Sequence, residues 1–289
     1  MDATHEGRPG ADALLRQVAR DFATDPDEAL RAFEEGVRIL EKDAAPRPEV
    51  RVRLWARAGQ LAVFSGRIDQ ALRRLYDALA IADDGYLALQ LGNALQWYGD
   101  APSIDEAEGH FDRALAHARR ARDGTLAISA LCGRGEVWTW RGRPDRARAA
   151  FGEALGITEF SPGDGPTIAP LAGLATAHAE GGVPEKAARL AERALERALR
   201  VGDAAGEARA RMAAARITGD AAELLRAAEA AERAPHRPLA LRARLHAWRL
   251  DPDEPGRVRL LAAARDAGMR GDAAALAPGV DQGGRSERD

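Results

Sequence analysis

An internal repeat constrains the fold of this 289-residue chain more than any other feature of its sequence. Four stretches each carry three apolar residues spaced four and then three apart, which places them on one face of a helix. These triplets are Ala71-Leu75-Ala78, Ala107-Phe111-Ala114, Ala147-Phe151-Ala154 and Ala187-Ala191-Ala194. A small residue precedes each triplet, by twelve positions at Gly59, Gly135 and Ala175 and by a longer interval at Gly92. Each stretch is therefore predicted to form two antiparallel helices that stack on the next pair.

The composition supports an all-α class. Hydrophobic residues make up 46% of the chain and charged residues 30%, which is typical of a globular protein, whereas aromatic residues make up only 5%. Ala supplies much of the apolar share, and Ala has the highest helix propensity. Runs of Val, Ile, Thr and aromatic residues, which would form strands, are missing from the sequence.

The repeat resembles the tetratricopeptide repeat (TPR), a helix pair with a period of about 34 residues and small and large positions in this order. The stretch LGNALQWYGD from Leu91 carries the resemblance, together with Asp105-Glu106-Ala107, Phe111 and Ala114-Leu115 further on. The resemblance implies a right-handed, all-α solenoid of about seven antiparallel helix pairs, which amounts to about one superhelical turn. Small residues in the middle of the first helix would let the paired helices approach closely.

The expected solenoid spans residues 11–277, between polar ends at 1–10 and 278–289 that we expect to be disordered. The clearest repeats are 52–84, 85–122, 128–160 and 168–202. Degenerate copies flank them, with Ala29, Phe33 and Gly36 on the upstream second helix and residues 207–233 and 238–268 downstream. If the solenoid is divided into two sub-bundles, the Gly- and Pro-rich stretch 160–167 is the expected place.

Charge and targeting signals argue against several classes of function. The formal net charge of −3 and the pI of about 6.1 give no general attraction to nucleic acid. The first ten residues are polar, and no run approaches eighteen apolar residues, so we expect neither a secretory signal nor a membrane span. A single cysteine, Cys132, leaves no intrachain disulfide, and a cytoplasmic location is the natural expectation.

Motifs for catalysis or cofactor binding are also missing from the sequence. It contains no phosphate-binding Gly loop followed by Lys and Ser or Thr, no HExxH, no CxxC and no nucleophile elbow. Gly133-Arg134-Gly135 is similar to part of a dinucleotide fingerprint, but the repeat already explains Gly135. His110 and His117 share a helix without a third metal ligand on that face. We therefore expect a non-catalytic protein with no cofactor and no metal.

The TPR resemblance implies that the first helix of each pair lines a concave groove. By this criterion the candidate partner-binding residues are Gln60, Phe64, Tyr86, Asn93, Gln96, Trp97, Glu136 and Trp140. Phe64, Trp97 and Trp140 hold one equivalent position in three successive repeats. The rings could form an aromatic stripe that grips an extended or helical peptide, or they could pack between neighbouring repeats. We favour the interpretation that the rings line the groove. In a chain with few aromatic residues, three of them would rarely share one repeat position by coincidence.

Some TPR proteins hold a C-terminal carboxylate with a clamp of Lys, Asn and Arg, and this chain departs from that pattern. It keeps Asn93 but has Ala56 and Gln60 in the preceding repeat, and Ser129 and Gly133 where the clamp needs basic residues. A chaperone tail is therefore not the expected ligand.

The expected function is that of a scaffold or adaptor whose groove binds a peptide or a segment of another protein. Two alternatives stay open. One is a ligand- or peptide-sensing regulatory module that acts in trans on transcription, and the other is a scaffold that assembles with copies of itself into a homo-oligomer.

Overall fold

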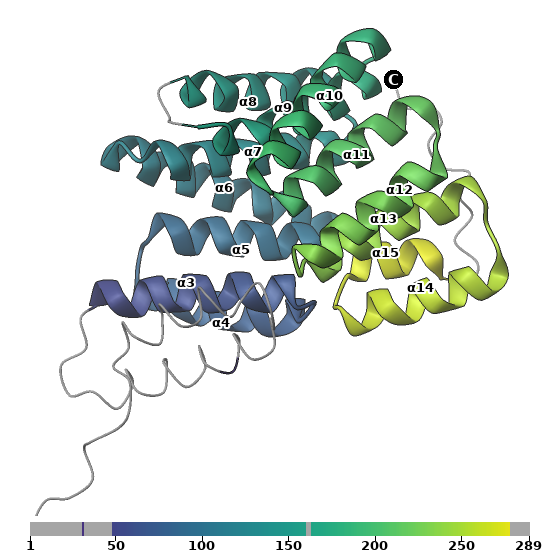
Figure 1. The fold of residues 1–289 in the computed structure, drawn as a ribbon. Helices are drawn as coiled ribbons and strands as arrows, with labels where there is room; N and C mark the ends of the chain where they lie inside the picture. The colour runs from purple at the N-terminus through teal and green to yellow at the C-terminus, as the bar shows by residue number, and fades with distance from the viewer. Residues whose placement is uncertain (1–30, 32–47, 160–162, 278–289) are drawn as a thin grey trace, which may run out of the picture.

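The computed structural model describes residue 31 and residues 48–159 and 163–277, and within these ranges every regular element is a helix (Figure 1). The helices are α3 (Pro48–Phe64), α4 (Ile68–Ile81), α5 (Gly85–Tyr98), α6 (Ala101–Ala121), α7 (Gly124–Trp140), α8 (Pro144–Thr158), α9 (Gly165–Glu180), α10 (Pro184–Val201), α11 (Ala204–Thr218), α12 (Ala221–Arg233), α13 (Arg237–Leu250), α14 (Glu254–Asp266) and α15 (Arg270–Leu276). Successive helices stack as hairpins, which confirms the all-α solenoid.

Several sequence predictions fall outside the described residues. These are the upstream helix pair with Ala29, Phe33 and Gly36, and the polar ends at 1–10 and 278–289. Part of the loop at 160–167 also lies outside them, at 160–162. Helices α8 and α9, on either side of that loop, pack against each other.

Glycine and aspartate mark the ends and starts of the helices. The glycines that follow α3, α5, α7, α9 and α11 have φ between 65° and 77°, a left-handed conformation that favours glycine; they are Gly66, Gly99, Gly142, Gly182 and Gly219. Aspartate side chains accept backbone N–H groups at the starts of α5, α6, α7, α11 and α12, from Asp84, Asp100, Asp123, Asp203 and Asp220.

The spacing of small and large residues has a direct packing cause. A Cβ atom added to Gly92 would lie 2.8 Å from the ring of Phe111, and one added to Gly135 would lie 2.6 Å from the ring of Phe151. Gly133, on the first helix of the following hairpin, also lies against Phe111, and a Cβ there would overlap the ring. Each phenylalanine is therefore wedged between the first helices of two successive hairpins, where only glycine leaves room.

The two ends of the described solenoid meet. Helices α14 and α15 lie beside α4 and the end of α5 (Figure 1), and buried residues of both ends belong to one core. Arg270 forms an ion pair with Asp69 at 3.6 Å, and a Cβ added to Gly271 would overlap the carbonyl of Gly99. The pattern of the repeat did not predict α15, although this short helix follows α14 through the left-handed Gly268 and packs against it.

Candidate functional site

The three aromatic residues of the predicted stripe occupy equivalent places but different surroundings. Phe64, Trp97 and Trp140 each lie two residues before the left-handed glycine that follows their helix. The side chain of Trp97 is only 8% exposed and that of Phe64 is partly buried, whereas Trp140 is 44% exposed. The prediction of one continuous exposed stripe is therefore wrong for Trp97, and of the three rings only Trp140 is well exposed.

His236, directly before α13, accounts for this difference. Its imidazole stacks on Phe64 with ring centroids 4.3 Å apart and meets Trp97 edge-on at 5.1 Å. The guanidinium of Arg242 lies 4.2 Å from the centre of the Trp97 ring. The closure of the solenoid places the turn between α12 and α13 against the C-terminal ends of α3 and α5, so two of the three rings are covered by the same chain.

Two candidate polar residues on α5 differ in how firmly they are held. Gln96 is buried, and its amide nitrogen donates a hydrogen bond to the carboxylate of Glu136, which ties α5 to α7. Asn93 is partly buried, and its amide nitrogen lies 3.5 Å from the side-chain oxygen of Gln90. Because 3.5 Å is the outer limit of a hydrogen bond, the amide of Asn93 is left largely uncommitted.

The remaining candidates, Gln60 and Tyr86, lie on the neighbouring first helices α3 and α5. Tyr86 is 42% exposed, and its hydroxyl donates a hydrogen bond to Asp123 at 2.6 Å, across from α5 to the start of α7. Gln60 is partly buried on α3 and accepts a hydrogen bond from Arg57. Both side chains are thus oriented by a neighbour and keep part of their surface accessible.

Arg209 on α11 influences groups on two other elements. Burial raises the pKa of the Cys132 thiol, the charge of Glu136 raises it further, and Arg209 opposes both. Burial also lowers the pKa of His236 well below its usual value, and Arg209 adds to this effect. Both groups are therefore neutral near pH 7. Helices α7 and α11 both pack against α9, so Arg209 and Cys132 belong to first helices on either side of α9.

Within the described ranges, Arg209 has neither a hydrogen bond nor an ion pair, although its side chain is partly buried. Arg209 and Glu136 both act electrostatically on Cys132, and Asn93 lies on the neighbouring first helix α5. We call these four residues the inner-face cluster. It combines an uncommitted amide, a carboxylate and an unpaired cation on α5, α7 and α11, which are all first helices of their hairpins. A partly buried, unpaired guanidinium is suited to binding a carboxylate.

A pocket of about 510 Å³ lies where α3 meets the α12–α13 turn, α13 and α14. We call it the seam pocket; its lining includes Phe64, Ser65, Pro235, His236, Leu241 and Arg244. The seam pocket is separate from the inner-face cluster, because none of the four cluster residues lines it.

Comparison with known proteins places this geometry in a structural class. No family model and no curated protein matches the sequence. The crystal structure of a Rap protein complexed with Competence and Sporulation Factor matches with a TM-score of 0.67 and 15% identity, over 93% of this chain and 74% of that one. The apo form of RapI matches with a TM-score of 0.63 and 12% identity, over 92% and 98%.

A third structure carries the repeat in its name. The Q17M structure of the nearly identical TPR-like repeats of a putative kinesin light chain from Podosopora anserina matches with a TM-score of 0.51 and 15% identity, over 68% of this chain and 99% of that one. The fold is a TPR-type solenoid. At these identities the similarity concerns the fold. Among the described residues, the TPR-type hairpins are the four clear repeats of the sequence, the α11–α12 hairpin, and the α13–α14 pair, whose two helices pack less extensively against each other.

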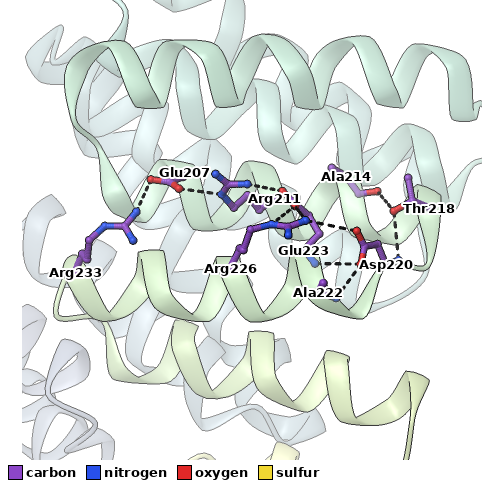
Figure 2. A network of polar contacts seen from close by, with 9 residues as sticks. All are labelled: Glu207, Arg211, Ala214, Thr218, Asp220, Ala222, Glu223, Arg226 and Arg233. Atoms are coloured by element: carbon purple, nitrogen blue, oxygen red, sulfur yellow. Dashed lines mark hydrogen bonds and ion pairs between the residues drawn. The ribbon is translucent and has the colours of Figure 1, made fainter.

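A charge network in this TPR-type solenoid joins α11 to α12 (Figure 2). Glu207 is 8% exposed and accepts hydrogen bonds from Arg211 at 2.9 Å and from Arg233 at 2.7 Å. Arg211 also donates to Glu223 at 2.7 Å, and Arg226 donates to the same carboxylate at 2.7 Å. Figure 2 shows these side chains pointing toward one another between the two helices, so the network fastens the hairpin and leaves none of its carboxylates uncommitted.

Two kinds of feature are absent from the described part of the TPR-type solenoid. No group of three or more His, Cys, Asp and Glu side chains is arranged there as metal ligands would be. Nor is any helix there long and apolar enough to cross a membrane.

The sequence did not single out His236, Arg242, Arg209 or Ser65 as functional residues. His236 is followed by Arg237-Pro238, which indicates only the start of a helix. The position of these residues depends on how far the TPR-type solenoid turns before its ends meet. That angle accumulates over all hairpins, and no local pattern encodes it.

Proposed function

We propose that this protein is a non-catalytic scaffold that binds an extended, acidic segment of another protein along the inner face of its solenoid. The observation that supports this most is Arg209, a partly buried cation without a partner in the described ranges, opposite Cys132 and Glu136. An isolated guanidinium in such a place loses solvation, and a carboxylate from a bound segment would compensate for that loss.

The neighbouring side chains fit an extended peptide. The amide of Asn93 and the accessible part of Gln60 offer hydrogen bonds to a peptide backbone, and exposed Trp140 offers an apolar surface for one side chain. Phe64, Trp97 and Gln96 are held by contacts within the chain and would shape the surface rather than bind the segment directly. Tyr86 lies at the far end of α5, where a longer segment would reach it.

Photo-crosslinking tests this proposal, because it reports which surface of the protein the partner contacts. A photoreactive amino acid replaces Asn93 in one variant and the exposed Arg189 on α10 in another, and each is irradiated in extracts of the producing cells. We expect a protein that crosslinks from position 93 and not from position 189. Adding Arg209→Glu should remove this crosslink by reversing the charge that the acidic segment meets, while Arg189→Glu should leave it intact.

Crosslinking only from position 189 would contradict the proposal, as would a crosslink at position 93 that Arg209→Glu does not weaken. The first result would place the partner on the outer surface. The second would show that the unpaired guanidinium has no role in binding.

A regulatory module that senses a ligand is the second candidate. The seam pocket favours it, because its walls come from both ends of the solenoid.

A further inference from the structure

Two residues that line the seam pocket each carry a buried polar atom that the other described residues do not satisfy. Neither the hydroxyl oxygen of Ser65 nor Nε2 of His236 has a hydrogen-bond partner among the described residues, although both atoms are shielded from solvent. The whole side chain of His236 is only 1% exposed. Burying a polar group without a partner costs about 1–3 kcal/mol in a folded protein. Two such atoms lining one pocket therefore indicate that something else binds them.

The hydrogen bonds around His236 determine what it can offer. Its Nδ1 atom accepts a hydrogen bond from the backbone N–H of Leu239 at 3.4 Å, at the first turn of α13. Since an accepting Nδ1 carries no proton, the neutral ring carries its proton on Nε2. Nε2 is therefore a donor, and the Ser65 hydroxyl can serve as a second donor. Together they fit a ligand atom that accepts hydrogen bonds.

The remaining lining residues supply an apolar wall and no free carboxylate that could bind a cationic head group. The ring of Phe64 and the side chain of Leu241 form part of the wall. Arg237 and Arg244 also line the pocket, but Arg237 is paired with Asp266 and Arg244 with Glu232, so the head group must be bound by His236 and Ser65. The carboxylate of Glu232 is already paired with Arg244, so it is not free to bind a cation.

We propose that the seam pocket binds a small organic carboxylate with an apolar body, held by Nε2–H of His236 and the hydroxyl of Ser65. A volume of about 510 Å³ is within the range of pockets that hold such molecules. The walls come from the end of α3 on one side and from α12, α13 and α14 on the other, so the ligand binds only while these two ends of the solenoid are in contact. Binding therefore stabilises the closed solenoid.

The probe is phenylacetate, added to the full chain and followed by saturation-transfer-difference NMR. Phenethylamine, which has the same ring and a cationic head, is the matched ligand control. We expect saturation transfer to phenylacetate and none to phenethylamine. Ser65→Ala should weaken phenylacetate binding about fivefold, the effect of losing one hydrogen bond. Ser129→Ala, on α7 and outside the pocket lining, should bind as the wild type does.

A second substitution, His236→Phe, should weaken binding further, because it keeps an aromatic ring against Phe64 but removes the Nε2–H donor. If this variant does not fold, Ser65→Ala alone decides the outcome. Absence of saturation transfer to phenylacetate would overturn the proposal and assign the two buried atoms to bound water. Equal affinity of wild type and Ser65→Ala, or transfer to phenethylamine as strong as to phenylacetate, would also overturn it. None of these results bears on the inner-face cluster, which is tested by crosslinking.

Discussion

At the scale of single residues, contacts between glycine or alanine and phenylalanine decide how closely the helices approach. Such contacts were predictable from sequence because they lie within one hairpin or between neighbours, as with Gly135 and Phe151. The burial of Trp97 was not predictable, because its neighbour His236 comes from a distant hairpin and reaches it only through closure. The repeat thus predicted that Trp97 occupies the same position in its helix as Phe64 and Trp140. It could not predict which residue covers the ring of Trp97.

Enlarging Ala147 tests the packing of one hairpin. This residue is fully buried on α8, so Ala147→Leu should overpack the pair and lower the free energy of unfolding by about 1–3 kcal/mol. Gly152→Ala on the same helix is the matched control. A Cβ there meets no atom within 4 Å, so this change should raise stability by about 0.5–1 kcal/mol. Urea denaturation measures both, and an unchanged midpoint for Ala147→Leu would show that the packing register is wrong.

Trp97 and Trp140 provide a paired comparison at equivalent positions. Trp97→Ala removes a buried ring and should lower the free energy of unfolding by about 3–5 kcal/mol. Trp140→Ala removes an exposed ring, so we expect a loss well under half as large, and weaker binding of the partner segment. Thermal denaturation of both variants checks the first expectation. Similar destabilisation by the two substitutions would contradict the different surroundings of the rings.

At the scale of elements, the α11–α12 hairpin is held by buried charges in addition to apolar packing. Burial opposes ionisation of Glu207, but hydrogen bonds from Arg211 and Arg233 outweigh this effect and hold its pKa below the usual value of 4.5. A carboxyl group whose pKa is lower in the folded chain stabilises the fold fully above pH 4.5. That contribution is lost as the pH falls through the lowered pKa.

The substitution Glu207→Gln tests this contribution. The variant should be less stable than the wild type at neutral pH, because Arg233 loses its carboxylate partner. The difference should shrink as the pH falls below 4.5, where Glu207 of the unfolded wild type takes up a proton, and it should vanish below the lowered pKa of the folded chain. Glu229→Gln, at an exposed position of α12, is the control and should match the wild type throughout. Urea denaturation at a series of pH values measures the differences, and a gap independent of pH would argue against the charge network.

At the scale of the whole molecule, closure connects the two proposed binding surfaces. It covers Phe64 and Trp97 and forms the seam pocket, while the inner-face cluster lies outside that pocket. The sequence predicted about one superhelical turn through its resemblance to the TPR family. Contacts between the two ends complete this turn, and one of them is the ion pair between Arg270 and Asp69. They depend on α15, a helix that the sequence repeat does not predict.

Closure is tested most directly by small-angle X-ray scattering of the wild type and Gly271→Val. The backbone of Gly271 lies against the carbonyl of Gly99, so a valine side chain there should force the last hairpin away from the first. Gly152→Val is the matched control, since position 152 has open space around it. We expect a larger radius of gyration for Gly271→Val than for the wild type and Gly152→Val, with helical circular dichroism retained. Equal radii for all three folded proteins would contradict a closed solenoid.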